Sequence, residues 1–229
     1  MGNLSEFLME ELNVATAFTI PIFGGIEVAE STVISWVIMA IIVILTLVLT
    51  RNMRVEKHGK LQVGVEYAVT ALQNLVRGII GHEGERYVPY LSTVLVFLGI
   101  SNIFAIFGMK PPTKDLNVTA ALALMSIILV QAASIRQNKV GGWLKGFTKP
   151  SKVITPLNVM ELAIRPLSLC MRLFGNVMGA FVVMKLLEHL VPVILPAVFS
   201  LYFDFFDGLL QAYVFVFLTG LYIKEAVEE

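Results

Sequence analysis

Several ionisable residues stand within the apolar last third of the chain, between Val153 and Ile223. A charged side chain inside a membrane is costly, and it usually faces a protein interior or an aqueous cavity along an ion path. These residue types therefore favour ion transfer over bond chemistry. They are Glu161, Arg165, Arg172, Lys185, Glu188, His189, Asp204 and Asp207.

Arg172 has the most restricted chemistry of this set. Its guanidinium stays protonated at any biological pH, so it is a poor proton shuttle but can hold a permanent positive charge beside a moving carboxylate. The alternative is an ion pair with a carboxylate of its own chain. Glu161 and Arg165 are spaced i, i+4, and for them a simple pair on one helix face and a role in conduction both stay open.

Small residues surround Arg172 on one predicted helical face. Ser168, Gly175, Asn176 and Gly179 fall at −4, +3, +4 and +7 from it. Small side chains allow another helix to approach closely. That neighbour is either a helix of this chain or an external helix that passes along the face, and the spacing alone favours neither.

Hydropathy predicts the other helices of the chain. The 229 residues are 57% hydrophobic and 15% charged, against about 25% charged residues in a soluble domain. The intervals 31–50, 87–109 and 116–135 lack Asp, Glu, Lys and Arg. Each reaches the length of about 20 residues that a helix needs to cross a bilayer. Three such intervals disfavour the alternative of buried helices in a soluble protein.

Two longer helical stretches follow, at 155–190 and 194–224, with Pro192 and Pro196 around the break between them. Proline disrupts a helix interior, so we expect a long hairpin, tilted because each member exceeds a simple span. Residues 60–80 repeat apolar positions with the 3.6-residue period, which indicates a helix in the membrane interface or packed beneath the bundle; the stretch beginning at Gly81 should end it.

The predicted fold is an all-α membrane protein with about five crossing helices, one interfacial amphipathic helix and a single integral membrane domain over 1–229. If the hairpin turns near 191–192, Gln211 lies level with Arg172. Asp204 then lies about 10 Å further outward, at 1.5 Å per residue, and Glu161 lies toward the cytoplasm.

Basic residues set the expected orientation. Residues 1–30 contain no Lys or Arg, whereas 51–60 and 136–152 are basic. Basic loops stay in the cytoplasm, which places the N-terminus outside and the C-terminus inside. Lys110 and Lys114 fall in an outer loop, a mild conflict with this rule. No basic segment precedes an early apolar run, so we expect no cleaved signal peptide.

Other classes of function are disfavoured. The 17 basic and 17 acidic residues balance, so charge gives no reason to expect a nucleic-acid partner. The single Cys170 excludes an intrachain disulfide and a cysteine metal cluster. No glycine-rich nucleotide loop or metal-ligand cluster is present, so we expect no catalytic residues, no cofactor and no metal.

One stretch resembles a known family. Residues 156–176, PLNVMELAIRPLSLCMRLFGN, look like the signature of subunit a of F-type ATP synthases. Residues 111–119 resemble that family's outer loop and the start of its next helix, and 210–215 resemble its last helix. The likeness covers most of the chain from Arg51 onward.

The resemblance implies an ion-conducting stator subunit beside a ring of c subunits, with two offset half-channels to and from the ring carboxylates. The arginine matching Arg172 separates the half-channels and drives ion release. Gln211 matches the glutamine facing that arginine, Asn176 the motif asparagine, and Glu161 a carboxylate toward the cytoplasmic half-channel. Ser168, Gly175 and Gly179 would then face the ring.

This sequence departs from the family at two positions. Nine residues after the arginine many members have an ionisable residue, where this chain has Phe181. Seven residues before the glutamine some have histidine, where this chain has Asp204. The outer half-channel is then expected to use Asp204. Further candidates are Glu188, His189 and Asp207, while Lys185 can offset a nearby acid or extend toward the outer surface.

The implied partners are the c-subunit ring, the peripheral-stalk b subunits, the catalytic ATPase head, the lipid bilayer and transported H⁺ or Na⁺. The implied location is the cell inner (plasma) membrane, with ATP chemistry confined to partner subunits. The alternative is an independent multi-helix ion channel or transporter. A transporter would commonly show two related halves with broken helices, and the sequence shows none.

Overall fold

The fold consists mainly of long helices. The computed structural model describes residues 16–20, 26–51, 53, 59–82, 84–104, 111–146, 155–190 and 199–228. Its longer helices are α2 (Glu30–Thr50), α3 (Lys60–Ile80), α4 (Val88–Ile103), α5 (Leu116–Gly146), α6 (Thr155–Leu190) and α8 (Gly208–Glu228). The shorter elements are β1 (Thr16–Ile20), β2 (Ile26–Ala29), the 3₁₀ turns η1 (Glu85–Tyr87) and η3 (Pro112–Lys114), and the π-helix η5 (Leu201–Asp207).

Within the described ranges, four helical segments are long and apolar enough to cross a membrane. They are Glu30–Thr50, Leu116–Lys139, Thr155–Glu188 and Leu201–Val227. They correspond to four of the predicted spans, and the predicted all-α membrane class is confirmed.

The fifth predicted span, 87–109, is represented by α4, which has 16 described residues; residues 105–110 lie outside the described part. The predicted break at Pro192 and Pro196 also lies outside it. Helix α5 continues past the predicted end at 135, and its regular geometry breaks at Lys139, which has a φ of 58°.

A β-hairpin precedes the first span, which the sequence did not predict. Strands β1 and β2 pair antiparallel, with Thr19 opposite Glu27, and β2 leads directly into α2. Strand residues such as those of 16–20 are enriched in β-branched and aromatic types, but a run this short carries a weak signal.

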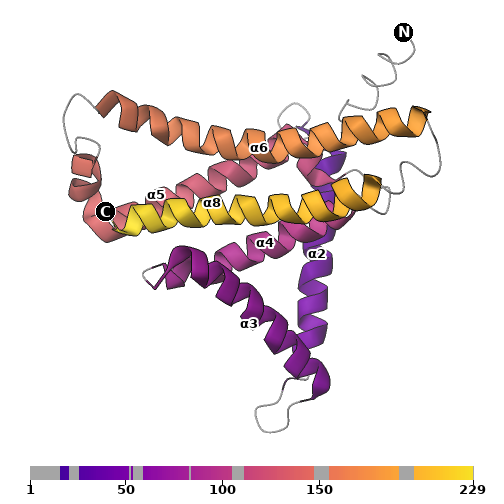
Figure 1. The fold of residues 1–229 in the computed structure, drawn as a ribbon, viewed down its shortest axis with the longest axis horizontal. Coiled ribbons are helices and arrows are strands. Elements are labelled where there is room, and N and C mark those ends of the chain that lie inside the picture. The colour runs from indigo at the N-terminus through magenta and orange to yellow at the C-terminus, as the bar shows by residue number, and fades with distance from the viewer. Residues whose placement is uncertain are drawn as a thin grey trace.

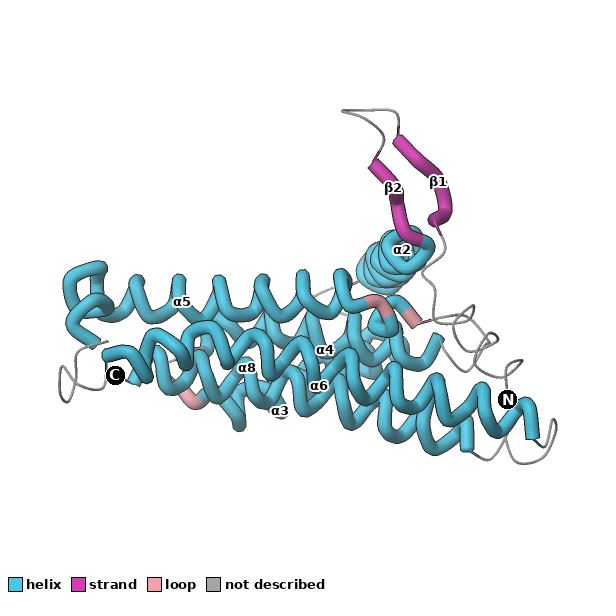
Figure 2. The backbone as a smooth tube through the Cα atoms, turned by 90° about the horizontal axis from the view of Figure 1, so that it is seen from above, coloured by secondary structure: helices cyan, strands magenta, loops and turns pink. Residues whose placement is uncertain are grey.

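The long helices are not all aligned with one another. Helices α5, α6 and α8 run lengthwise beside one another, and α2 crosses their direction (Figure 1). Seen from above, α2 appears nearly end-on (Figure 2). The 34-residue span Thr155–Glu188 is about 50 Å long at 1.5 Å per residue. It exceeds a hydrocarbon core of about 30 Å, and the tilt expected from this length stays a prediction.

Helix α8 forms the centre of the packing. It contacts α3, α4, α5 and α6, and its side chains Ala212, Phe215, Val216 and Ile223 are almost fully buried. Close approach depends on Gly220, where an added Cβ would lie 2.8 Å from Ile79 Cγ2 of α3. These contacts fix the face of α8 that carries Gln211.

Helix α3 is anchored mainly at its C-terminal end. Val76, Ile79 and Ile80 are buried, whereas Leu61 and Tyr67 near its start are exposed. The helix ends at Gly81, whose φ of 77° is readily available only to glycine. The predicted range 60–80 and its glycine stop are therefore both observed.

Candidate functional site

Arg172 lies on an open face of α6. It is exposed, and among the side chains that the structure describes it has no ion-pair or hydrogen-bond partner. An added Cβ at Gly175 or Gly179 would meet no atom within 4 Å. Gly175 and Gly179 are exposed and Ser168 is partly buried. For Gly175 and Gly179 the geometry therefore favours a face that the described helices of this chain leave uncovered.

The glycines of α8 behave in the opposite way. A Cβ at Gly208 would lie 2.9 Å from Asn102 Cβ, and one at Gly220 would contact Ile79. These two glycines are used for packing inside the chain, whereas Gly175 and Gly179 leave room on its outside. Among the described residues, none fills the space next to Gly175 and Gly179.

Gln211 meets α6 at Asn176. Asn176 Nδ2 donates a 2.6 Å hydrogen bond to Gln211 Oε1, and Gln211 is buried. The sequence places Gln211 level with Arg172. In the structure Gln211 contacts Asn176, which follows Arg172 by four residues, so this contact lies about one helical turn further along α6. Asn176 is exposed on the same side of α6 as Arg172, and its bond to Gln211 joins α6 to α8 one turn from the arginine.

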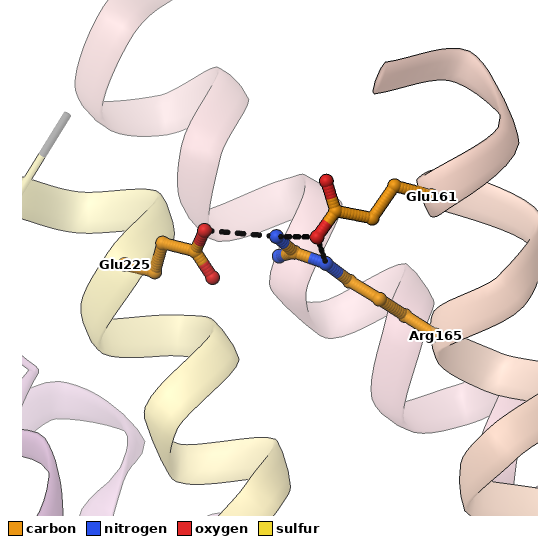
Figure 3. Close-up of polar contacts among 3 residues, drawn as sticks. All are labelled: Glu161, Arg165 and Glu225. Carbon is orange, nitrogen blue, oxygen red and sulfur yellow. Dashed lines mark hydrogen bonds and ion pairs between the residues drawn. The ribbon is translucent and has the colours of Figure 1, made fainter. Parts of the chain in front are cut away.

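Three charged residues meet near the other end of α6 and α8 (Figure 3). The Arg165 guanidinium contacts one oxygen of Glu161 at 2.8 and 3.1 Å and an oxygen of Glu225 at 2.8 Å. The guanidinium carbon also lies 4.9 Å from the Tyr222 ring centroid. The predicted i, i+4 pair is present, and Glu225, which the sequence analysis did not single out, completes it from α8.

Burial within this cluster is uneven. The Arg165 side chain is 18% exposed, whereas Glu161 and Glu225 are 51% and 47% exposed. The single guanidinium therefore lies between two half-exposed carboxylates, and the formal charge of the three is negative. Such a cluster attracts cations while tying α8 to α6.

The candidate acids at the opposite end lie in unusual backbone. Asp204 and Asp207 both belong to the π-helix η5, which leads into α8 at Gly208. Asp207 is partly buried. The side chains of Asp204 and His189 lie outside the described set. Short π segments often occur at functional sites, and this one was not predicted from sequence.

Glu188 and Lys185 form a local pair. Lys185 Nζ lies 2.9 Å from Glu188 Oε2, so the lysine offsets an acid as expected. Lys185 also lies 5.8 Å from the Phe181 ring centroid, and Lys114 Nζ lies 3.4 Å from the same centroid. Phe181 therefore contacts Lys114 of η3 by a cation–π interaction.

Buried polar residues also link the starts of α5 and α8 to other elements. Asp115 accepts a hydrogen bond from Ser31 of α2 and another from the Asn117 backbone N–H at 2.9 Å. Asp115 therefore caps the start of α5 and ties it to α2. Its position one residue before an apolar run is the signal that could have identified the cap. Asn102 joins Thr113 and Gly208, for which no local sequence signal exists.

No metal centre is formed by the described side chains, since no group of three or more His, Cys, Asp or Glu residues gathers among them. Cys170 is buried, with its sulfur 3.6 Å from Thr119 Oγ1. The arrangement instead offers fixed charges, amides and an uncovered face, which suit ion transfer beside a partner.

Comparisons with known proteins agree along most of the chain. A family model described as ATP synthase A chain matches residues 32–224. ATP synthase subunit a of Moorella thermoacetica is 37% identical over 205 residues, covering 89% of this chain and 93% of that protein. ATP synthase subunit a 1 of Hahella chejuensis is 33% identical and covers 90% and 87%. The sodium ion specific ATP synthase subunit a of Propionigenium modestum is 31% identical and covers 89% and 75%.

Proposed function

The chain belongs to the ATP synthase A-chain family, and we propose that it conducts ions past a rotating ring as the stationary membrane subunit of an F-type complex. Two offset half-channels lead to and from carboxylates on that ring. Arg172 separates them and drives release of the ion. The chain itself carries out no ATP chemistry, which belongs to the catalytic head.

The observation that carries this proposal is the exposed Arg172 on a face that the chain leaves uncovered. The glycines Gly175 and Gly179 extend that face by one and two turns, and a Cβ added at either would meet no atom of the described residues within 4 Å. A helix of the c-subunit ring fits there, because small residues permit close approach. Its carboxylate would then pass within reach of the guanidinium.

The physical action of Arg172 follows from its fixed charge. A cation near a carboxylate favours the ionised form, so the bound H⁺ or Na⁺ leaves as the carboxylate approaches. The same positive charge opposes passage of a cation directly between the half-channels. The hydrogen-bonded pair of Asn176 and Gln211 supports this function by holding the adjacent turn of α6 against α8.

The remaining polar groups divide between the two paths. Glu161 belongs to the cytoplasmic path, and the net negative charge of Glu161, Arg165 and Glu225 supports a negatively charged mouth there. Asp204 belongs to the outer path, with Glu188, His189 and Asp207 as further contributors. The N-terminus lies outside and the C-terminus in the cytoplasm, within the cell inner membrane. Contact with peripheral-stalk b subunits keeps the chain stationary.

Reconstituted vesicles containing the whole complex provide the test. Arg172→Ala should abolish ATP-driven ion pumping, because ions are no longer displaced and can leak between the paths. Arg136→Ala, which removes an exposed arginine from α5, is the matched control and should pump normally. Comparison with and without Na⁺ identifies the coupling ion. Normal coupled pumping by Arg172→Ala would refute the proposed mechanism.

A further inference from the structure

The junction between η5 and α8 is held by a side chain from another helix. At this junction the Gly208 N–H donates to the carbonyls of Phe203 and Phe205, and the bond to Phe203, five residues earlier, follows the π-helical pattern. The Gly208 carbonyl accepts a 2.7 Å hydrogen bond from Asn102 Nδ2 of α4. A carbonyl has two lone pairs, so this bond adds to the helix's own hydrogen bonding.

Close packing reinforces the hydrogen bond. A Cβ at Gly208 would lie 2.9 Å from Asn102 Cβ, so only glycine lets the α8 backbone approach the amide this closely. Asn102 is 3% exposed and Gly208 is buried. Water therefore cannot readily replace the amide as a partner for this carbonyl.

Thr113 of η3 fixes the direction of the amide. Its Oγ1 donates a 2.9 Å hydrogen bond to Asn102 Oδ1, and Thr113 is fully buried. With its oxygen held in this way, the Asn102 amide must present its nitrogen to Gly208. Helix α4 and the turn η3 that follows it are thereby joined to the distant start of α8, directly after the segment that contains Asp204 and Asp207.

The π-helical geometry of η5 affects which of its residues are exposed. Among the side chains that are described in this segment, those at 201–202, 205–206 and 209–210 are exposed, whereas Phe203 and Asp207 are partly buried. This four-residue repeat is longer than the period of about 3.6 residues of an α-helix. If η5 adopted α-helical geometry, its residues would rotate about the helix axis relative to α8. The angle would be larger for residues further before Gly208. Leu201 would turn away from the exposed side and Phe203 would turn toward it.

We propose that Asn102, oriented by Thr113, is a positioning residue that maintains the π-helical turn and so sets the rotation of the segment carrying Asp204 and Asp207. This inference rests on the proposed function for its effect on transport. Its structural part stands separately, because the rotation of η5 can be measured without any transport.

The first experiment measures that rotation in the assembled complex. Single nitroxide labels are placed at Leu201 and Phe203, with Leu209 as reference, in a complex otherwise free of cysteine. Collision with dissolved oxygen, which concentrates in lipid, reports exposure. In the parent chain the Leu201 label should collide more often than the Phe203 label. In Thr113→Val, which removes the orienting hydroxyl at nearly constant shape, this order should reverse.

A matched series separates positioning from general destabilisation. Thr113→Ser retains the hydroxyl and should restore both the parent collision order and ATP-driven pumping, whereas Thr113→Val should lose pumping several-fold. Thr219→Val removes another fully buried hydroxyl, one bonded within α8 to the Phe215 carbonyl, and should behave as the parent. Gly208→Ala, which forces the amide away, should reproduce the reversal seen with Thr113→Val.

An unchanged collision order in both Thr113→Val and Gly208→Ala would overturn the positioning role, whatever happens to pumping. A reversed order with normal pumping would overturn its importance for transport. Failure of the proposed function appears elsewhere, as normal coupled pumping by Arg172→Ala, so the two outcomes are distinguishable.

Discussion

At the scale of single residues, arginine is used in two different ways on the same helix. Arg165 is mostly buried and contacts two carboxylates, one from its own helix and one from α8. Arg172 is exposed and, within the described side chains, unpaired. A paired guanidinium stabilises structure, because its charge is already compensated. An unpaired guanidinium remains available for a carboxylate that arrives from outside.

The pairing of Arg165 with Glu225 should be measurable as a coupling free energy. We expect Arg165→Leu and Glu225→Gln each to lower the free energy of unfolding, since each breaks a bond between α6 and α8. Because Glu225 is 47% exposed, solvent screening limits the coupling to about 0.5–1 kcal/mol. A double-mutant cycle in detergent measures it, with Arg77 and Glu85, a more exposed pair, as the comparison. Strict additivity would contradict the expectation.

At the scale of elements, α6 and α8 use glycine for opposite purposes. Gly208 and Gly220 let α8 pack against α4 and α3, whereas Gly175 and Gly179 keep one face of α6 free. The two kinds cannot be told apart by residue type or spacing, because both fit close helix approach. They differ only in whether a neighbour from the same chain is present.

Enlarging these glycines should therefore have different consequences. Gly175→Val should leave the folded subunit as stable as the parent, because an added Cβ meets none of the described residues, yet it should block association with the ring. Gly220→Val should destabilise the subunit itself by about 1–3 kcal/mol through overpacking. Thermal unfolding of the isolated subunit and co-purification with c subunits separate the two. A loss of subunit stability in Gly175→Val would show that the face is covered.

At the scale of the whole molecule, α2 crosses the direction of the long helices. A separation along the hairpin is therefore not the same as a difference in depth along α2. The sequence-based separation of about 10 Å between Asp204 and Arg172 counts 1.5 Å per residue along the helix axis. Helices α6 and α8 instead run crosswise to α2 (Figure 1). If α2 lies along the membrane normal, much of that separation is lateral within the membrane plane.

The expected orientation can be checked by labelling from each side of the membrane. A cysteine at Phe18, exposed on the β-hairpin, should react with an impermeant maleimide from outside intact cells. A cysteine at Gln137, exposed near the end of the second long span, should react only in inverted vesicles. Both are introduced after Cys170→Ala. Reaction of both from the same side would contradict the proposed orientation.

Local sequence properties determined most of the secondary structure. Hydropathy located α2 and α5, and the 3.6-residue period together with Gly81 gave the observed bounds of α3. The range 155–190 coincides with α6. These features could be predicted because helix formation and membrane insertion depend on residues that are neighbours in the chain. The unusual charges, above all Arg172, were visible for the same reason.

Only the tertiary structure decided which of these residues meet. It joined Gln211 to Asn176, brought Glu225 to Arg165 and placed Asn102 against Gly208. It also introduced a π-helical turn at Asp204 and Asp207 and left Gly175 and Gly179 uncovered. These outcomes depend on the register and crossing of helices far apart in sequence. A shift of one turn changes every contact while leaving the local helical pattern intact.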